Sequence, residues 1–406
     1  MRVRTTARVT AAAVAGFVAG AVLTLSLQGE ATRPGSEIAG DVSGTPPPVT
    51  VPEAPDTFLA WTPGGLPQGF RQQIAKLPGI ERVVVVASDN TWLTDSFNAQ
   101  GEVVDDPRGG FAIPLEVAAV GPREYAPFLP PADRGVMVAL GQEGLPQGIL
   151  GESSARLRGL GLGALLQFGD VRVQVAAILP DELVGAHELM VSRSVGRSIG
   201  VTHDRYALLQ PEGQPTDRQL ASELRGILPR GLGVQIRAPG EAPYFRMGDA
   251  TLPPVRLKML FGEFAAKPTP GHRGYLTLDP GWVEAHIATE RVPLLGEVTC
   301  NVALFPQIRG GIQELIAAGL ADTIHGYSGC FARRFANRDP KAAISHHAWG
   351  VALDINVPEN PFGAPPNQDP RMVAVFERWG FIWAGTFIRP DGMHFEYRRP
   401  PAGGQG

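Results

Sequence analysis

The residues whose types and spacing could do chemistry lie in two short segments near the C-terminus. In Val351–Asn356, apolar residues alternate with small or polar ones, which predicts a strand with one buried face. Asp354 falls on the other face of that strand. Gly392–Tyr397 alternates in the same way and places His394 and Glu396 together on one face. Two apolar strands are therefore expected to present polar side chains to a site.

These side chains, together with His347 just before the first strand, match the ligands of a metal centre. Two imidazoles and one carboxylate, with a fourth position left open, form the ligand set of a catalytic zinc. Nitrogen and oxygen ligands of this kind suit Zn²⁺ better than Ca²⁺ or Mg²⁺. His347, Asp354 and His394 are accordingly predicted to hold zinc. Asp391, three residues before His394, is near enough to serve as general base, and Glu396 could orient the His394 ring.

The segment around His347 carries a longer motif. Ser345, His347, Gly350, Ala352 and Asp354 together give S-x-H-x-x-G-x-A-x-D. This resembles the signature of the zinc D,D-peptidases that cut bacterial cell-wall peptides, the VanY-like carboxypeptidases and VanX-like dipeptidases. In that family the His and the Asp are zinc ligands, and a later His is the third. The resemblance implies a zinc peptidase that acts on peptidoglycan stem peptides.

The second segment extends the resemblance. Asp391, His394, Phe395 and Glu396 form D-x-x-H-F-E, which is similar to the branch that contains phage L-alanyl-D-glutamate endopeptidases. Asp391 stands in the place of the catalytic acid of that branch. The resemblance covers about Thr299–Arg398. It leaves open which bond is cut, because D-Ala-D-Ala carboxypeptidases and L-Ala-D-Glu or D,D-endopeptidases share these motifs.

One part of the family pattern is altered in this chain. Many relatives carry G-Y-R-S upstream, with an arginine that stabilises the oxyanion, whereas Gly326–Gly329 here is Gly-Tyr-Ser-Gly. The resemblance implies that Arg333 supplies this charge, with the adjacent Arg334 as the alternative. Ser345 could either hydrogen-bond the substrate or cap a turn.

Structural roles compete with these chemical ones. A lone histidine near an apolar strand usually belongs to the packing, and the motif spacing is what favours His347 and His394 as ligands. His346 would point away from His347 on a strand, so it is not expected to be a ligand. Asp391 could be a solvated turn residue, and a surface salt bridge is the alternative role of Arg333.

Helices must pack around the two strands to hold these residues. Asp279 followed by Pro280 predicts a helix start, with a capping carboxylate and a proline in the first turn. Apolar residues at helical spacing from Leu304 to Ile316 predict a second helix, with Gly319 where a C-cap would lie. The expected catalytic domain is therefore α+β, a small antiparallel sheet flanked by helices, as in the hedgehog and D-Ala-D-Ala peptidase folds.

Residues 59–250 also alternate strand and helix signals. Val83–Ala87 and Arg172–Ile178 predict strands, and Gln219–Leu228 has the apolar spacing of a helix. No phosphate-binding loop, H-E-x-x-H or G-x-S-x-G motif accompanies these elements. Gly151–Val191 resembles the extracytoplasmic domains of FtsX/MacB-type permeases. This part is expected to be a separate α+β domain whose role and protein partner the sequence does not indicate.

The N-terminus predicts export. Basic residues before Val9–Leu27, which carries no charge, predict a transmembrane helix whose C-terminal side lies outside the cytoplasm. The chain would then be a single-pass membrane protein; a cleaved signal peptide, which would leave it secreted, is the alternative. Because disulfides persist outside the cytoplasm, Cys300 and Cys330, the two cysteines of the chain, are expected to be bonded.

The composition is typical of a folded chain with several parts. Its 406 residues are 44% hydrophobic and 19% charged, which is enough to bury a sizeable core. The net charge is −4 and no long run of like charges occurs, so a nucleic-acid partner is not expected. We expect a cytoplasmic tip and transmembrane anchor over residues 1–27 and a Pro-rich linker over 28–58. An extracytoplasmic α+β domain should follow over 59–250. A zinc peptidase domain should then occupy 251–406, with its motifs in 299–398.

A second function remains open. Hedgehog signalling domains resemble the fold of this family and keep a zinc without needing hydrolysis. The alternative is therefore a non-catalytic, zinc-stabilised module that binds peptidoglycan or regulates another protein. The presence of Asp391 favours the peptidase, because an inactive site is expected to lose its base before its ligands.

Overall fold

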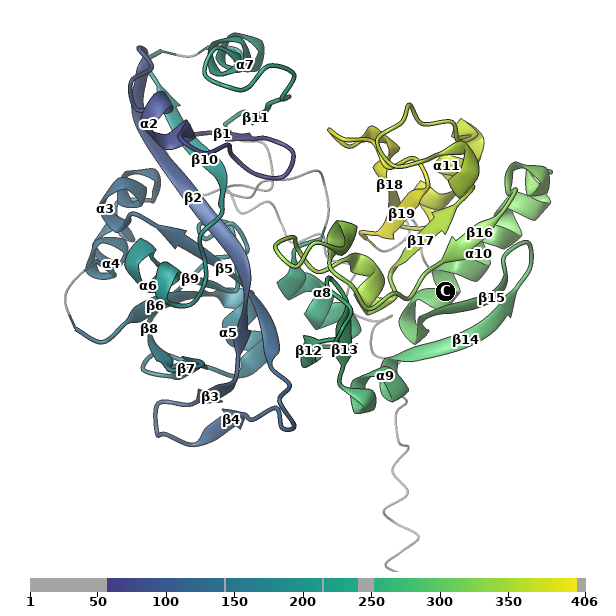
Figure 1. Cartoon of the computed structure of the whole chain (residues 1–406), viewed down its shortest axis with the longest axis horizontal. Coiled ribbons are helices and arrows are strands. Elements are labelled where there is room, and N and C mark those ends of the chain that lie inside the picture. The colour runs from purple at the N-terminus through teal and green to yellow at the C-terminus, as the bar shows by residue number, and fades with distance from the viewer. Residues whose placement is uncertain (1–56, 142–143, 214, 240–251, 400–406) are drawn as a thin grey trace, which may run out of the picture. The chain divides into compact units, whose positions relative to one another are not determined.

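The computed structural model describes residues 57–141, 144–213, 215–239 and 252–399 (Figure 1). The predicted anchor, and the predicted linker up to residue 56, lie outside these ranges. Within them, no helix has the length and apolar character needed to cross a membrane. Helices and mainly antiparallel strands are mixed along the described chain, so the predicted α+β class is confirmed.

The N-terminal half of the described chain is built on one 11-stranded sheet, with the order β11-β1-β10-β2-β5-β9-β6-β8-β7-β3-β4. Neighbouring strands are antiparallel except for the pairs β5/β9 and β6/β8. The strands are β1 (Phe58–Trp61), β2 (Ile80–Leu93), β3 (Asp95–Phe97), β4 (Val103–Asp105), β5 (Ile113–Val120), β6 (Gln147–Gly151), β7 (Leu165–Phe168), β8 (Val171–Leu179), β9 (Leu189–Ser192), β10 (Asp204–Pro211) and β11 (Gln235–Arg237).

Strand β2 lies between β10 and β5 in this sheet and is the long ribbon in the purple part of Figure 1. It contains the predicted strand Val83–Ala87, whose residues from Val84 onward are buried. The strand continues through Ser88–Thr91, although these residues are polar, because they pair with β5. The apolar run therefore predicted the strand but not its length.

Short helices cover this sheet. They are α2 (Phe70–Ile74), α3 (Pro122–Tyr125), α4 (Arg134–Ala139), α5 (Glu152–Arg158), α6 (Arg193–Ser198) and α7 (Asp217–Arg225). Helix α7 confirms the helix predicted there. Its Thr216 and Gln219 form a capping box, in which each side chain accepts from the backbone N–H of the other residue.

The C-terminal part of the chain contains a second, smaller sheet. Its four strands follow the order β16-β17-β19-β18, and all pairs are antiparallel, as the sequence predicted for a small sheet in this part. The strands of this part are β12 (Ala266–Pro268), β13 (Leu276–Leu278), β14 (Ile287–Val292), β15 (Gly296–Asn301), β16 (Tyr327–Gly329), β17 (Ala352–Ile355), β18 (Phe381–Trp383) and β19 (His394–Tyr397). The helices are α8 (Pro254–Phe261), α9 (Pro280–His286), α10 (Phe305–Ala317) and α11 (Pro370–Arg378).

Both predicted helices of this part are present. Asp279 caps α9 by accepting from the Gly281 backbone N–H. Helix α10 buries its apolar stripe against α11, and the ring of Trp379 lies so close to Gly310 that a Cβ there would collide with it. Leu353 and Phe395, on the apolar faces of β17 and β19, are fully buried in the same core. The small sheet is therefore held on one face by helices.

Two tight links fix the small sheet to its surroundings. The predicted disulfide between Cys300, in β15, and Cys330, just after β16, is present, with a Cα–Cα distance of 5.4 Å. The backbone N–H of Phe331 also donates to the carbonyl of Thr299, at 3.1 Å. The segment that follows β16 is thereby anchored to the β14–β15 hairpin.

A buried charge cluster joins α8 to the large sheet. Lys258 Nζ lies 2.7 Å from Glu188 Oε1 and 3.0 Å from Glu263 Oε1. Arg158 pairs with the same two carboxylates. The side chains of Arg158 and Glu188 are 0% exposed and that of Lys258 is 1% exposed, while another side of α8 packs in the core around the small sheet. Helix α8 is thus shared between the two packed regions.

Candidate metal centre

Three side chains with metal-ligating atoms converge on the open face of the small sheet. Asp354 Oδ1 lies 3.3 Å from His347 Nε2 and 3.1 Å from His394 Nδ1. One ligand atom from each residue falls within 4.8 Å of the others, and no second group of this kind occurs among the described residues. The three residues that the sequence predicted as ligands are therefore brought together.

Strand pairing positions two of these residues. Asp354 of β17 and His394 of β19 are direct cross-strand partners, so their side chains leave the sheet on the same face. Their neighbours Leu353, Ile355 and Phe395 are fully buried on the other face. The alternating pattern therefore has the orientation that the sequence predicted, and the buried face holds the two ligands in place.

A tight turn positions the third. His347 lies in a 3₁₀ helix, His346–Trp349, which ends at Gly350 with a φ of 68°. A Cβ on Gly350 would lie 2.7 Å from the backbone nitrogen of Asn301, so the glycine of the motif is required both by its left-handed backbone and by this close approach. The turn delivers His347, 3% exposed, to the start of β17.

Hydrogen bonds on the far side of each ring fix which nitrogen faces the centre. His347 Nδ1 lies 2.7 Å from the Cys330 carbonyl oxygen, which can only accept, so Nδ1 carries the proton and Nε2 carries the lone pair. His394 Nε2 lies 3.1 Å from Glu396 Oε2, which leaves His394 Nδ1 directed at Asp354. This contact supports the predicted role of Glu396, which is to orient the His394 ring.

These atoms suit a bound cation. His347 Nε2 is buried and has no aligned hydrogen-bond partner among the described residues. Burial would raise the pKa of Asp354, but its contacts with His347 and His394 outweigh burial and hold that pKa far below its usual range. Burial would also lower the pKa of His394, but Asp354 and Glu396 outweigh it and raise the pKa to about 10. The carboxylates of Asp354 and Glu396 therefore favour a positive charge between them, and a bound metal ion would supply that charge.

Asp391 lies at the edge of this centre. It begins a turn in which its carbonyl accepts from the His394 backbone N–H, at 3.1 Å. Its Oδ1 is buried without a hydrogen-bond partner in the described structure. Burial raises the pKa of Asp391, and the nearby Asp354 charge adds to this, while His394 and His347 oppose it. A carboxyl with a free oxygen and a raised pKa suits a group that takes up a proton and later returns it.

The sequence did not predict that His346 would contact Glu396. A strand would direct His346 away from His347, but the two residues lie in a 3₁₀ turn, not a strand. His346 Nδ1 lies 2.8 Å from Glu396 Oε2, a charge contact without the alignment of a hydrogen bond. The group of candidate ligands consists of His347, Asp354 and His394 and does not include His346. A turn signal at Gly350 was the clue that could have revealed its direction.

The two arginines before the centre differ in position. Arg333 is exposed, whereas Arg334 is half-buried and its charge reaches Asp391, where it lowers the pKa against the effect of burial. The sequence could not separate the two. Ser345 is buried, and its backbone N–H donates to the Arg334 carbonyl at 3.1 Å. The Ser345 side chain makes no capping hydrogen bond to the turn that follows.

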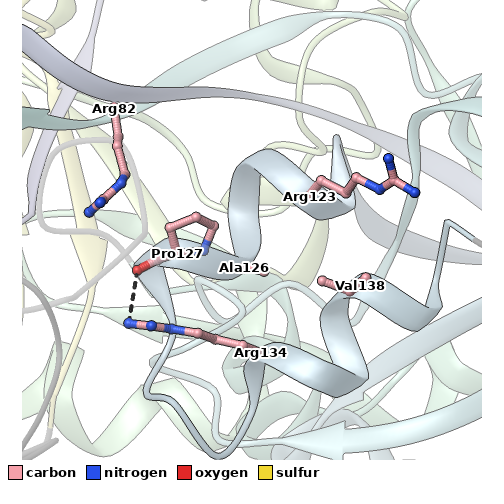
Figure 2. A pocket seen from close by; sticks show the side chains of 6 residues that line it. All are labelled: Arg82, Arg123, Ala126, Pro127, Arg134 and Val138. Carbon is pink, nitrogen blue, oxygen red and sulfur yellow. Dashed lines mark hydrogen bonds between the residues drawn. The ribbon is translucent and has the colours of Figure 1, made fainter.

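A hollow on the large-sheet region has different chemistry. It is lined by Arg82, Arg123, Ala126, Pro127, Arg134 and Val138 (Figure 2). Figure 2 shows Arg82 and Arg134 extending to one side and Arg123 to the other, with Arg134 donating to the Pro127 carbonyl at 3.4 Å. No imidazole or carboxylate lines this hollow, so it offers no metal ligand.

Comparison with known families agrees with the motifs. Residues 338–397 match the model of a peptidase family described as D-alanyl-D-alanine carboxypeptidase. The matched segment contains the three candidate ligands together with Asp391 and Glu396. The chain therefore carries a domain of this peptidase family over that segment, and the resemblance predicted from the sequence is confirmed. No curated protein matches the chain.

Solved structures resemble the chain only weakly. The periplasmic region of MacB from Actinobacillus actinomycetemcomitans has 12% identity and a TM-score of 0.30, over 46% of this chain and 89% of that chain. The extracellular domain of the noncanonic ABC-type transporter YknZ from Gram-positive bacteria has 14% identity and a TM-score of 0.30, over 45% and 100%. A domain of a permease protein from Porphyromonas gingivalis has 15% identity and a TM-score of 0.28, over 48% and 93%. At these TM-scores the similarity establishes neither a shared fold nor a shared function.

Proposed function

We propose that the C-terminal part of the chain is a zinc-dependent peptidase that hydrolyses peptide bonds of peptidoglycan stem peptides, of the D-Ala-D-Ala carboxypeptidase type. The observation that carries this proposal is the convergence of His347 Nε2, Asp354 Oδ1 and His394 Nδ1 beside the free carboxyl oxygen of Asp391. A structural zinc site would use four protein ligands, whereas three leave a position open for chemistry.

The donor set selects the metal. Two imidazole nitrogens and one carboxylate oxygen fit Zn²⁺ better than a hard cation, which prefers oxygen ligands throughout. When bound, zinc acts as a Lewis acid on a carbonyl and makes water nucleophilic at neutral pH. His347 and His394 each donate their remaining N–H to an oxygen, and this keeps their lone pairs aimed at the centre.

Asp391 carries the proton transfers in this proposal. Its unpartnered Oδ1 accepts a proton from the attacking water, and the protonated carboxyl then donates that proton to the departing amine. The raised pKa of Asp391 favours the second step, because the carboxyl must hold the proton until the peptide bond breaks. The same group thus serves as base and as acid.

Arg334 is proposed to stabilise the negative charge that develops on the substrate carbonyl. Its charge already reaches Asp391 in the described structure, while Arg333, the residue favoured by the sequence, is exposed. Arg333 remains the alternative for this role. Ser345, buried next to Arg334 with no capping bond, is proposed to hydrogen-bond the substrate.

The proposed location is outside the cytoplasm. The Cys300–Cys330 disulfide supports it, because such bonds are rare in reducing compartments. Together with the uncharged Val9–Leu27 segment, it favours a membrane-anchored enzyme that reaches the cell wall.

Digestion of muropeptides tests the proposal. The full chain, incubated with purified stem peptides, should release D-alanine or cleave an internal bond, as read by mass spectrometry. Chelation should abolish the cleavage and added Zn²⁺ should restore it. A chain that binds one zinc but cleaves no stem peptide would refute the peptidase and point to the non-catalytic module.

A further inference from the structure

The loop at 336–344 connects two sides of the candidate centre. Phe335 and Ile344 pair across its base in an antiparallel bridge. Just outside that bridge, the Ser345 backbone N–H donates to the Arg334 carbonyl. The ends of the loop therefore carry the arginine and the serine proposed to meet the substrate, and His347 follows two residues later.

The loop adopts a backbone that needs support. Asn337 and Arg338 have φ values of 54° and 56°, in the left-handed region that non-glycine residues seldom adopt. Two successive residues of this kind cost free energy, so contacts from outside must hold them. Within the loop, the Ala336 N–H donates to the Ala343 carbonyl and the Ala342 N–H to the Asp339 carbonyl.

Outside contacts come from Tyr275, whose hydroxyl accepts from Arg338 Nε at 2.7 Å, and from the large sheet. Arg205, in β10, donates from Nη2 to the Lys341 carbonyl at 2.9 Å. Asn90, in β2, donates from Nδ2 to the Ala342 carbonyl at 3.3 Å. Two residues from neighbouring strands thus bind adjacent carbonyls of the loop. Both hydrogen bonds are accepted by backbone carbonyls of the loop and not by its side chains. They therefore depend on the backbone path of the loop.

Arg205 is itself held firmly. Its Nη2 lies 2.8 Å from Asp89 Oδ1, and its Nε donates to the Ser88 carbonyl at 2.7 Å. Asp89 is buried and also accepts from the backbone N–H groups of Thr202 and His203. The guanidinium therefore has a fixed direction, and the sheet that carries it is joined to α8 by the buried charge cluster.

We propose that the large-sheet region serves the peptidase as a frame that holds loop 336–344, with Arg205 as the positioning residue. It acts through Arg334 and Ser345, at the two ends of the loop, and not through the metal ligands. The effect of Arg205 on hydrolysis rests on the proposed function, whereas its restraint on the loop is independent of that function. Residues 57–239 thus have a role that the sequence did not indicate.

Hydrogen exchange and kinetics on the full chain test the proposal. In Arg205→Gln, the amides of Ala336, Ala342 and Ser345 should exchange at least tenfold faster. The value of kcat/KM for stem-peptide hydrolysis should fall at least tenfold, while zinc stoichiometry stays at one. Asn90→Ala, which removes a single contact, should show the same changes to a smaller degree and serves if Arg205→Gln does not fold. Arg82→Gln is the matched control, because Arg82 is exposed and pairs within the large-sheet region.

Three results would overturn the proposal, and a fourth would concern only the proposed function. Unchanged exchange in a folded Arg205→Gln or Asn90→Ala protein would overturn the proposal, and so would faster exchange with unchanged kcat/KM. Loss of zinc in Arg205→Gln would also overturn it, because the effect would then reach the ligands. If the wild-type chain hydrolyses no stem peptide, the proposed function fails on that result, while the exchange rates still decide whether Arg205 holds the loop.

Discussion

Asp354 and His394 face each other across the paired strands β17 and β19, with 3.1 Å between Asp354 Oδ1 and His394 Nδ1. Two of the three candidate ligands are therefore set by strand register, not by a loop. A slip of one residue by either strand would turn the ligand side chain of that strand toward the core. The buried face of the small sheet is what makes such a slip costly.

Removal of a ligand should release the metal. We expect His347→Ala and Asp354→Asn to bind less than one tenth of the zinc that the wild-type chain binds, because two ligands hold zinc weakly. Metal analysis after dialysis measures this. His325→Ala is the control, since His325 is exposed, pairs with Glu359 and is not one of the three candidate ligands. Full zinc occupancy in His347→Ala would remove that residue from the site.

Glu396 should tune zinc affinity without being a ligand. It accepts from His394 Nε2 at 3.1 Å, and loss of such a partner typically lowers metal affinity by about 10–100-fold. Glu396→Gln should therefore still bind one zinc per chain but release it to a competing chelator at lower concentrations. An unchanged affinity would mean that the contact does not orient the ring.

The buried charge cluster should make stability depend on pH. Burial would raise the pKa of Glu263, but Lys258 and Arg158 outweigh it and lower the pKa. A carboxyl with a lowered folded pKa stabilises the protein above its unfolded pKa, about 4.3, and this stability is lost as pH falls through the folded value. Urea denaturation from pH 7 to pH 3 should show this loss.

The variant Glu263→Gln separates this group from other carboxyls. It should be less stable than wild type at neutral pH, by roughly 1–3 kcal/mol, because two buried cations lose a charged partner. Its stability should also decline less steeply below pH 4.5 or so. Glu297→Gln, at an exposed position, is the control. Identical pH profiles for Glu263→Gln and wild type would contradict this assignment.

The disulfide should support both stability and the centre. In the chain-entropy model, closing a loop of this length contributes roughly 3–4 kcal/mol. The double variant Cys300→Ala/Cys330→Ala should lose about that much in urea denaturation. It should also bind zinc more weakly, because the Cys330 carbonyl holds the His347 ring. A double variant as stable as wild type would show that the bond contributes nothing measurable.

The sequence could predict the centre because its signals are local. Alternation placed Asp354 and His394 on open strand faces, and the motif spacing added His347. Other features depend on contacts between distant residues, which spacing does not encode. The Cys330 carbonyl, for example, reaches His347 only through the packing of two loops.

Other misses have similar causes. The turn at Gly350 redirects His346 toward Glu396, so a strand reading of that segment gave the wrong direction. The order of the large sheet pairs β1 with β10 and β11, which lie far along the chain, and no local pattern specifies such partners. Polar residues in β2 concealed the length of that strand, because their pairing with β5 carries no apolar signal.

The most direct test of the account combines zinc content and turnover in Asp391→Asn. The asparagine keeps the size of the side chain but cannot accept the proton, and the three ligands are untouched. The variant should hold one zinc per chain with near wild-type stability, while stem-peptide hydrolysis falls by about 10²–10⁴-fold, the usual contribution of a general acid–base group. Asp322→Asn, at an exposed position, should leave both values unchanged. Loss of zinc from Asp391→Asn would make Asp391 a ligand, and wild-type turnover would assign the base to another residue; either result would contradict the mechanism.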